Sequence, residues 1–520
     1  MDAMTKMGSA LGMVLVLVLA AGACGEREAF WDRDLGITGP VVLSDGGAFL
    51  SNSLEELIVV RADRKRELVL DRYPVAEAPQ VIKVMGDDRI LLWSKKDKTL
   101  DLVDPDGKAV RSYDLGTAFG GFRVSPEERF VVAWVTLATT TEDFFVNAGQ
   151  VAVVDLQEDE GPSNPRLISL KSYGDAPLGV YIAPAESAAG EIRQPALVTW
   201  RSYVSILDLR DDGISDVSVP LRPGDSDAEI YPGLLRFAEG DEDRVRAYFI
   251  STSSNDLYEI TIASDQLQES GAGAVAINLF PTAPAPLDFS IYRLDDGTLR
   301  IATICGSNRL VITDPESSET LVLQLAINPN RLKVFEMQSL DSTKIEVFAL
   351  ISSGSYSQFY LVELEHIALK MSKALHLTSA PAPVADVIEL PGQGQFLLFH
   401  TSGDSAISVA EPANDKLTSI LGTGSMETRL FLEDDDLLLV LTIRDGARYL
   451  VAMDTVTLHA RAVELDGSTG QAASLIPLPD ESMVLIWLAG EQRLVRVPLD
   501  FKDRSDLTDY PMFLFDELMD

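Results

Sequence analysis

The segments LDLVDPD from Leu100, VAVVDLQ from Val151 and VSILDLR from Val204 share one pattern, a short apolar strand that ends at an acidic turn. Short apolar or alternating runs bounded by turn residues are typical of β-strands. Seven further copies follow the same pattern: LIVVRAD from Leu57, LYEITIA from Leu257, LVITDPE from Leu310, YLVELEH from Tyr360, AISVAEP from Ala406, LVAMDTV from Leu450 and LVRVPLD from Leu494. Copies spaced by roughly 40 to 55 residues indicate a repeat whose unit has the length of a propeller blade.

A second apolar segment precedes each copy. In chain order these segments read AFLSNS, LLWSKK, VAWVTL, VTWRSY, YFISTS, ATICGS, ALISSG, LFHTSG, LTIRDG and LIWLAG. Continuous apolar character predicts a strand that is covered on both faces. Trp93, Trp134, Trp200 and Trp487 occupy one matching position in this segment. We expect them to pack between repeats rather than to form a stacked aromatic binding surface.

Tight polar turns often precede the apolar segment, as at 44–47, 86–88, 125–128, 294–297 and 479–481. Gly, Asp and Pro in these turns favour β-hairpins. Each unit thus contains four strands, which is the composition of a propeller blade. The sequence predicts an all-β fold, a β-propeller with about ten candidate units. A single ring of seven to ten blades is favoured over two smaller rings.

The repeat resembles the broad class of YVTN-like and WD40-like propellers, especially in GQVAVVDLQ from Gly149 and KTLDLVDPDGKAV from Lys98. The resemblance covers residues 41 to about 499 and concerns the blade pattern only. The chain lacks the Gly-His and Trp-Asp pairs of true WD40 repeats. The resemblance implies a propeller fold and assigns no ligand. In such rings the last blade is commonly completed by a strand from the other terminus, and PMFLF from Pro511 is apolar enough for that role.

The N-terminus predicts export and lipidation. LGMVLVLVLAAGA from Leu11 is roughly half as long as a membrane-spanning helix and fits the apolar core of a signal peptide. Ala-Gly-Ala directly before Cys24 resembles a bacterial lipobox. An ordinary cleaved signal peptide is the alternative. The expected parts are a signal peptide at 1–23, a lipidated tether at 24–40, the propeller at 41–502, and a tail at 503–520 that is a candidate ring-closing strand.

Charge and the residues after Cys24 bear on location and partners. The formal net charge is −37, which disfavours nucleic acid, because phosphate binding needs clustered Lys and Arg. Gly25 and Glu26 follow the cysteine without the Asp that retains lipoproteins at the inner membrane. We therefore expect an outer-membrane lipoprotein in the bacterial cell envelope, held to the membrane by lipid on Cys24. The only other cysteine, Cys305, lies in an apolar stretch and is expected in the core.

Local catalytic motifs are absent from the sequence. None of the four histidines (366, 376, 400 and 459) has a partner at metal-ligand spacing, and no HExxH, GxSxG or P-loop pattern occurs. We assign no catalytic residue and no cofactor. Two acidic turns are weak candidates for calcium, with the carboxylates Asp241, Asp243, Asp434, Asp435 and Asp436.

The loop TLATTTEDFFVN at 136–147 is the candidate contact loop. Phe144 and Phe145 either bind a protein partner or fold back onto the ring. The favoured function is a non-catalytic binding or scaffold protein with a protein partner. The alternatives are a lactonase-like, metal-dependent propeller hydrolase with its site at the ring centre, and an extracytoplasmic sensor or carbohydrate-binding protein. The sequence sets neither the ligand nor the oligomeric state.

Overall fold

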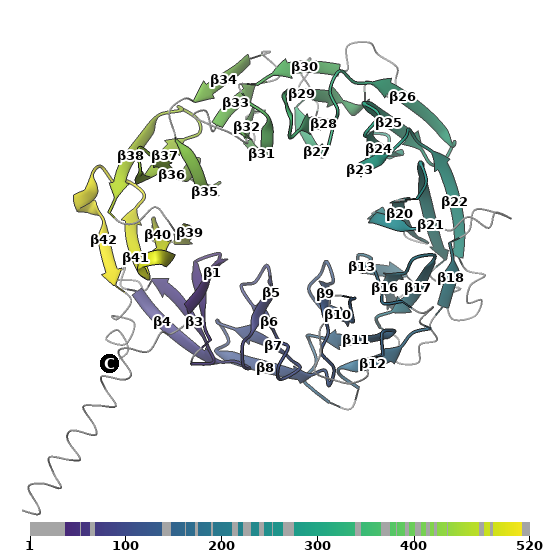
Figure 1. Cartoon of the computed structure of the whole chain (residues 1–520), viewed down its shortest axis with the longest axis horizontal. Helices are drawn as coiled ribbons and strands as arrows, with labels where there is room; N and C mark the ends of the chain where they lie inside the picture. The colour runs from purple at the N-terminus through teal and green to yellow at the C-terminus, as the bar shows by residue number, and fades with distance from the viewer. Residues whose placement is uncertain are drawn as a thin grey trace, which may run out of the picture.

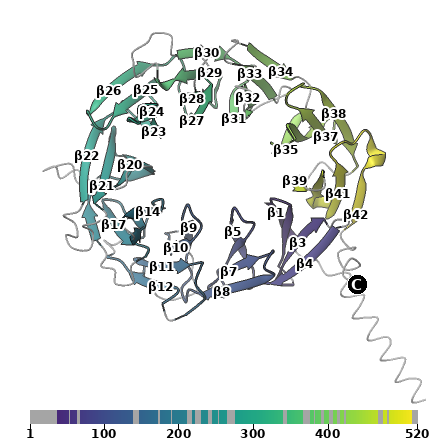
Figure 2. The ribbon, with the colours of Figure 1, turned by 180° about the vertical axis from the view of Figure 1, so that it is seen from behind.

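The computed structural model describes residues 37–511 except for the following gaps: 53, 63–67, 138–146, 162, 172–174, 189–190, 211–216, 222–229, 239–243, 252, 264–274, 339–344, 366–374, 381, 391–394, 401–406, 412–415, 421–423, 434, 467–472 and 479–481. Within these residues, ten four-stranded antiparallel sheets form one ring (Figure 1). The view from behind shows the same closed order of blades (Figure 2). The fold is a ten-bladed β-propeller, which confirms the predicted fold class and the single ring.

The first five blades follow the chain in order. Their strands are β1 (Ile37–Leu43), β2 (Gly46–Ser51), β3 (Glu56–Ala62) and β4 (Leu68–Pro74); β5 (Gln80–Val84), β6 (Ile90–Ser94), β7 (Thr99–Asp104) and β8 (Ala109–Asp114); β9 (Gly121–Val124), β10 (Phe130–Trp134), β11 (Gln150–Asp155) and β12 (Arg166–Ser169); β13 (Gly179–Ile182), β16 (Pro195–Thr199), β17 (Tyr203–Asp208) and β18 (Val217–Pro220); β19 (Pro232–Ala238), β20 (Arg244–Ser251), β21 (Asp256–Ala263) and β22 (Val275–Pro281). A separate hairpin, β14 (Glu186–Ala188) with β15 (Glu191–Arg193), is inserted in the fourth blade.

The other five blades repeat the arrangement. Their strands are β23 (Pro286–Arg293), β24 (Leu299–Cys305), β25 (Arg309–Asp314) and β26 (Glu319–Gln324); β27 (Arg331–Gln338), β28 (Ile345–Ser353), β29 (Tyr356–Glu363) and β30 (Leu375–Ser379); β31 (Val384–Leu390), β32 (Gln395–His400), β33 (Ile407–Glu411) and β34 (Lys416–Ile420); β35 (Ser425–Leu432), β36 (Leu437–Arg444), β37 (Ala447–Asp454) and β38 (Ala460–Leu465); β39 (Ala473–Leu478), β40 (Met483–Leu488), β41 (Arg493–Pro498) and β42 (Thr508–Pro511). Two short 3₁₀ turns, Ala489–Glu491 and Arg504–Asp506, lie in the last blade.

The two repeated sequence segments form the second and third strands of each blade. The second strands β6 and β10 are buried along their whole length, as their continuous apolar character predicts. The fourth strand β8 at the outer rim exposes most of its residues. Neighbouring sheets therefore cover both faces of the middle strands, and the first strand of each blade lies nearest the ring centre (Figure 1).

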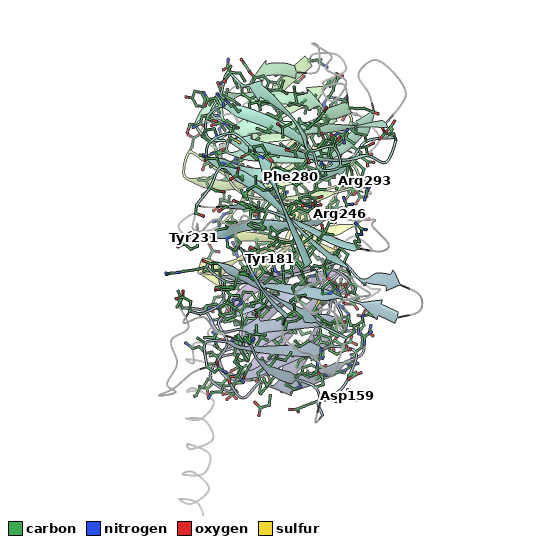
Figure 3. The ribbon with its side chains drawn as sticks, turned by 90° about the vertical axis from the view of Figure 1, so that its right-hand side faces the viewer. Asp159, Tyr181, Tyr231, Arg246, Phe280 and Arg293 are labelled. Carbon is green, nitrogen blue, oxygen red and sulfur yellow. The ribbon has the colours of Figure 1, made fainter. Side chains whose placement is uncertain are left out.

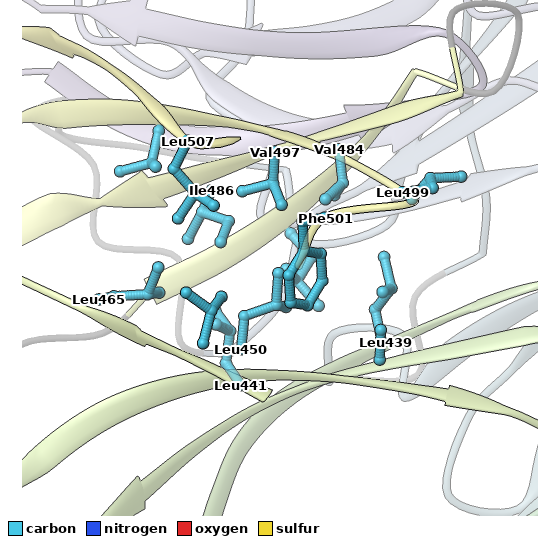
Figure 4. Close-up of a cluster of buried hydrophobic side chains, with 14 of the residues drawn as sticks. Leu439, Leu441, Leu450, Leu465, Val484, Ile486, Val497, Leu499, Phe501 and Leu507 are labelled. Carbon is cyan, nitrogen blue, oxygen red and sulfur yellow. The ribbon is translucent and has the colours of Figure 1, made fainter. Parts of the chain in front are cut away.

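The hydrophobic core lies between blades. One cluster joins the ninth blade, through Leu439, Leu441 and Leu450, to Val484 and Ile486 of the tenth (Figure 4). The four tryptophans at the matching position of the repeat are all buried in clusters of this kind. This confirms that they pack in the core.

The ring closes by side-chain packing between the first and last blades. The four strands of each sheet follow one another in the chain, apart from the β14–β15 hairpin inserted in the fourth blade, and β42 pairs with β41 of its own blade. Residues 512–515 of the candidate ring-closing segment lie outside the described residues. Phe49 meets Trp487 edge-on, with the ring centroids 4.9 Å apart. Gly47 permits close approach at the same joint, because a Cβ there would lie 2.9 Å from Ile476 Cδ1.

The antiparallel order gives the ring two different faces. Turns between first and second strands and between third and fourth strands lie on one face, which we call the turn face. Turns between second and third strands and the links between blades lie on the other, the linker face. Figure 3 shows Asp159 on the turn face and Tyr231 on the linker face. Among the described residues, no helix has the length and apolar character needed to span a membrane.

Candidate functional site

Most of the predicted site residues lie outside the described part of the chain. These are Cys24, Phe144, Phe145, Asp241, Asp243 and Asp434. Asp435 is exposed, and Asp436 has a left-handed backbone with φ of 50°. The Asp436 carbonyl accepts hydrogen bonds from the backbone amide of Thr455 at 2.8 Å and from the Thr455 hydroxyl at 3.0 Å. Across the described ranges, no three His, Cys, Asp or Glu side chains are grouped so as to hold a metal ion.

The histidines and Cys305 occupy different environments. His366 lies outside the described residues, His376 lies on β30, and His459 is exposed. His400 is buried: Nδ1 donates to the Ala382 carbonyl at 2.9 Å, so Nε2 accepts from the Ser408 hydroxyl at 2.8 Å. Burial lowers the His400 pKa. Cys305 is fully buried, as expected, and burial raises its thiol pKa.

Charged side chains of the innermost strands connect neighbouring blades. Arg236 on β19 pairs with Asp288 on β23 at 2.9 Å and also donates to the Ser290 hydroxyl at 3.1 Å. Burial raises the pKa of Asp288, an effect that Arg236 opposes. On the opposite arc of the ring, Arg429 of β35 pairs with Asp386 of β31. The four side chains belong to the strands nearest the ring centre, where the hydrolase alternative places its site, and their ion pairs join neighbouring blades.

Carboxylates in two first turns make similar connections. Asp88 is buried and accepts hydrogen bonds from the backbone amide of Ser44 at 2.9 Å and from its hydroxyl at 2.5 Å. Glu128 accepts from the Gly86 amide at 2.8 Å and pairs with Lys83 at 2.7 Å. Each carboxylate thus reaches the first turn of the preceding blade. Acidic residues that suggested only hairpin geometry in the sequence also join blades.

A buried polar network in the fifth blade was not predicted. Tyr248, Glu259 and Asn278 lie directly opposite one another on β20, β21 and β22. Glu259 accepts from the Tyr248 hydroxyl at 2.6 Å and from Asn278 Nδ2 at 2.7 Å. Burial and the neighbouring Glu259 carboxylate raise the Tyr248 pKa. The available signal was a charged residue inside the otherwise apolar strand LYEITIA, since a buried charge needs partners.

Exposed apolar side chains occur on the linker face in several blades. Leu137, at the start of the loop that carries Phe144 and Phe145, is 72% exposed. Leu178 in the link to the fourth blade is 49% exposed, and Tyr356 at the start of β29 is 48% exposed. Leu287 near the start of β23 is 45% exposed. Leu137 is the most exposed large apolar side chain among the described residues, although others lie elsewhere, such as Val456 on the turn face at 59%.

Comparisons with known proteins give distant likenesses. No protein-family model and no curated protein matches the chain. Dihydro-heme d1 dehydrogenase NirN in complex with DHE is similar at 12% identity with a TM-score of 0.42, covering 76% of this chain and 77% of that chain. A eukaryotic initiation factor is similar at 11% identity with a TM-score of 0.47, covering 81% and 96%. Apo AztD from Citrobacter koseri is similar at 11% identity with a TM-score of 0.34, covering 67% and 86%. Identities this low concern the fold alone, which the strand pairing of this chain already establishes.

Proposed function

We propose that this chain is an exported, lipid-anchored propeller of the YVTN-like and WD40-like class that binds a protein partner without catalysing a reaction. The observation that carries the proposal is the set of exposed apolar side chains on the linker face, with Leu137 the most exposed of them. Leu137 begins the loop in which the sequence places Phe144 and Phe145. The partner would contact this loop and the neighbouring links between blades.

The inner charged residues support a scaffold role. Arg236, Asp288, Arg429 and Asp386 pair across blade boundaries, and the turn carboxylates make further connections. These ion pairs and hydrogen bonds between neighbouring blades favour a ring that keeps its shape while its loops bind a partner. A rigid surface loses less conformational entropy on association than a flexible one does.

The anchor is the second part of the proposal. We infer that lipid on Cys24 holds the ring at the outer membrane, from the apolar segment at 11–23 and the small residues before the cysteine. Several acyl chains supply stable anchoring at about 0.8 kcal/mol for each buried methylene. A clickable fatty acid fed to producing cells should label the wild-type protein and leave Cys24→Ser unlabelled. Equal labelling of both would contradict lipidation at this residue.

A charge placed on the linker face tests partner binding. Leu137→Asp should release the chain from its complex in gently solubilised envelopes, because an exposed carboxylate would be buried against an apolar partner surface. Val456→Asp is the matched control, since Val456 is 59% exposed in a turn on the turn face. Native electrophoresis should show the monomer for Leu137→Asp and the complex for the control. A monomer in wild-type envelopes, or a complex that survives Leu137→Asp, would contradict the proposal.

A stability measurement separates contact from core packing for the two phenylalanines. Replacing Phe144 and Phe145 with Ser should leave the Tm nearly unchanged if their rings face a partner. Each ring would contribute to stability if it folded back, because burying a large apolar side chain is worth about 1.5–3 kcal/mol. Thermal unfolding of the double variant beside wild type decides between the two, and a large drop in Tm ends the contact hypothesis.

A further inference from the structure

A small cavity opens between the third and fourth blades on the turn face. Its volume is about 180 Å³, well below the roughly 300–1,000 Å³ of pockets for drug-sized ligands. Phe130, the first residue of β10, forms a buried apolar wall. Polar and charged side chains form most of the remaining lining: Arg129, Asp155, Glu158, Ser163, Asn164, Arg166 and Arg210.

The wall of the cavity is fixed by a buried asparagine. Asn164 Nδ2 donates to the carbonyls of Asp155 at 2.9 Å and Glu158 at 3.1 Å, and Asn164 Oδ1 accepts from the Asp155 amide at 3.0 Å. Arg166 spans the blade boundary and donates to the Leu209 carbonyl. The segment between β11 and β12 is thereby held against the fourth blade.

Two guanidinium groups lie over the same aromatic ring. The Arg129 Cζ atom is 4.8 Å from the Phe130 centroid, and the Arg210 Cζ atom is 5.9 Å from it. Arg129 is neutralised by Asp155, whose Oδ2 accepts from Nε at 2.9 Å and from Nη2 at 2.6 Å. Arg166 adds a third guanidinium to the lining.

Arg210 differs from Arg129 because its Nε atom has no hydrogen-bond partner among the described residues. That Nε atom is buried, whereas the Nε of Arg129 donates to Asp155. Burial lowers the pKa of Arg210 and the nearby Arg129 charge lowers it further, whereas the carboxylates of Glu127, Asp155 and Asp208 oppose this shift. A buried donor without a partner is costly, by about 1–3 kcal/mol, and an anion would satisfy it.

We propose that this cavity binds a small oxyanion, the carboxylate or phosphate group of a small molecule, with Arg210 as its main ligand and Arg129 and Arg166 beside it. The planar guanidinium fork matches two oxygens of such a group. The cavity volume suits a group of this size. The site concentrates cations in a chain whose formal net charge is −37, so local geometry, and not overall charge, provides the attraction. The proposal is independent of the lipid anchor and of the partner on the linker face.

Calorimetric titration of the full purified chain tests the site. Succinate, acetate and inorganic phosphate are titrated separately at constant ionic strength set with chloride, which distinguishes the carboxylate and phosphate sources. We expect saturable binding of at least one of these anions. Arg210→Gln should weaken that binding by tenfold or more, and Arg210→Lys should weaken it less, because Lys keeps the charge but loses the fork.

Arg293→Gln is the matched control, since Arg293 is an exposed arginine on the same face and lines a different pocket. It removes one positive charge and should leave the affinity unchanged. A circular dichroism spectrum and Tm equal to those of wild type verify that Arg210→Gln is folded. The proposal is overturned if none of the three anions binds saturably, or if Arg210→Gln and Arg293→Gln bind with the affinity of wild type.

Discussion

At the scale of single residues, carboxylates that serve as turn formers also act as joints. Asp88 has a φ of 63°, a conformation that Asp and Asn both adopt readily. Its side chain is buried and accepts two hydrogen bonds from Ser44 in the preceding blade. Its contribution therefore depends on its charge and not on its backbone preference.

Asp88→Asn isolates that charge. The variant keeps size and backbone preference, but it weakens two charge-assisted hydrogen bonds at a buried site. We expect a loss of about 1–2 kcal/mol in the free energy of unfolding. Asp87→Asn is the control, because Asp87 is exposed and pairs locally with Arg89, and it should cost less than about 0.5 kcal/mol. Urea unfolding of both variants measures the difference, and equal losses would show that Asp88 does not join the blades through its charge.

His400 makes stability depend on pH. Its pKa in the fold is lowered by burial, whereas an unfolded histidine titrates near pH 6.5. Between the folded pKa and about 6.5, the unfolded chain binds more protons, so the free energy of unfolding falls as pH falls. His400→Gln should flatten this dependence below about pH 6.5 relative to the wild-type chain. Urea unfolding at several pH values measures both, and an unchanged slope for His400→Gln would contradict a buried neutral imidazole.

At the scale of elements, the joint between the first and last blades differs from the other nine. Each other pair of neighbouring blades is connected by the chain, whereas in the described part of the chain β1–β4 and β39–β42 meet through side-chain packing. Phe49 and Trp487 are at the centre of this joint. Loss of packing there should allow the two terminal blades to separate locally, because no covalent link keeps them adjacent.

Trp487→Ala tests this joint. Both Trp487→Ala and the control Trp93→Ala, at the boundary between the second and third blades, should lower the free energy of unfolding by about 3–5 kcal/mol. The two variants should nevertheless differ in which backbone amides exchange hydrogen faster than in wild type. Amides of β1–β4 and β39–β42 should exchange faster in Trp487→Ala, but those of the terminal blades should keep their protection in Trp93→Ala. Uniform acceleration around the ring in both variants would contradict closure by local packing.

The second and third strands were predictable from sequence because burial on both faces selects long apolar runs such as ILLWS in β6. The first strands were harder to find, since β5 and β9 are short and only partly buried. Joints such as Arg236 with Asp288 depend on which strands become neighbours at a separation of 52 residues. A single sequence does not encode that adjacency in any local pattern. The approach of Arg129 and Arg210 over Phe130 likewise depends on the packing of two neighbouring blades, which no local sequence pattern encodes.

At the scale of the whole molecule, the ring presents two faces that are built from different loops. The linker face exposes Leu137, Leu178, Leu287 and Tyr356, and the turn face holds the arginine-lined cavity. A closed ring has no free edge between its blades, so the faces and the outer rim remain for binding. We propose that the linker face binds a protein partner in the cell envelope.

Site-specific photo-cross-linking in intact envelopes tests that claim most directly. A photoreactive amino acid is placed at Leu137 on the linker face or at Val456 on the turn face, two positions that are both more than half exposed. We predict a discrete cross-linked species from position 137 that is absent from position 456. Cross-linking from position 456 alone, or from neither position, would contradict a partner on the linker face.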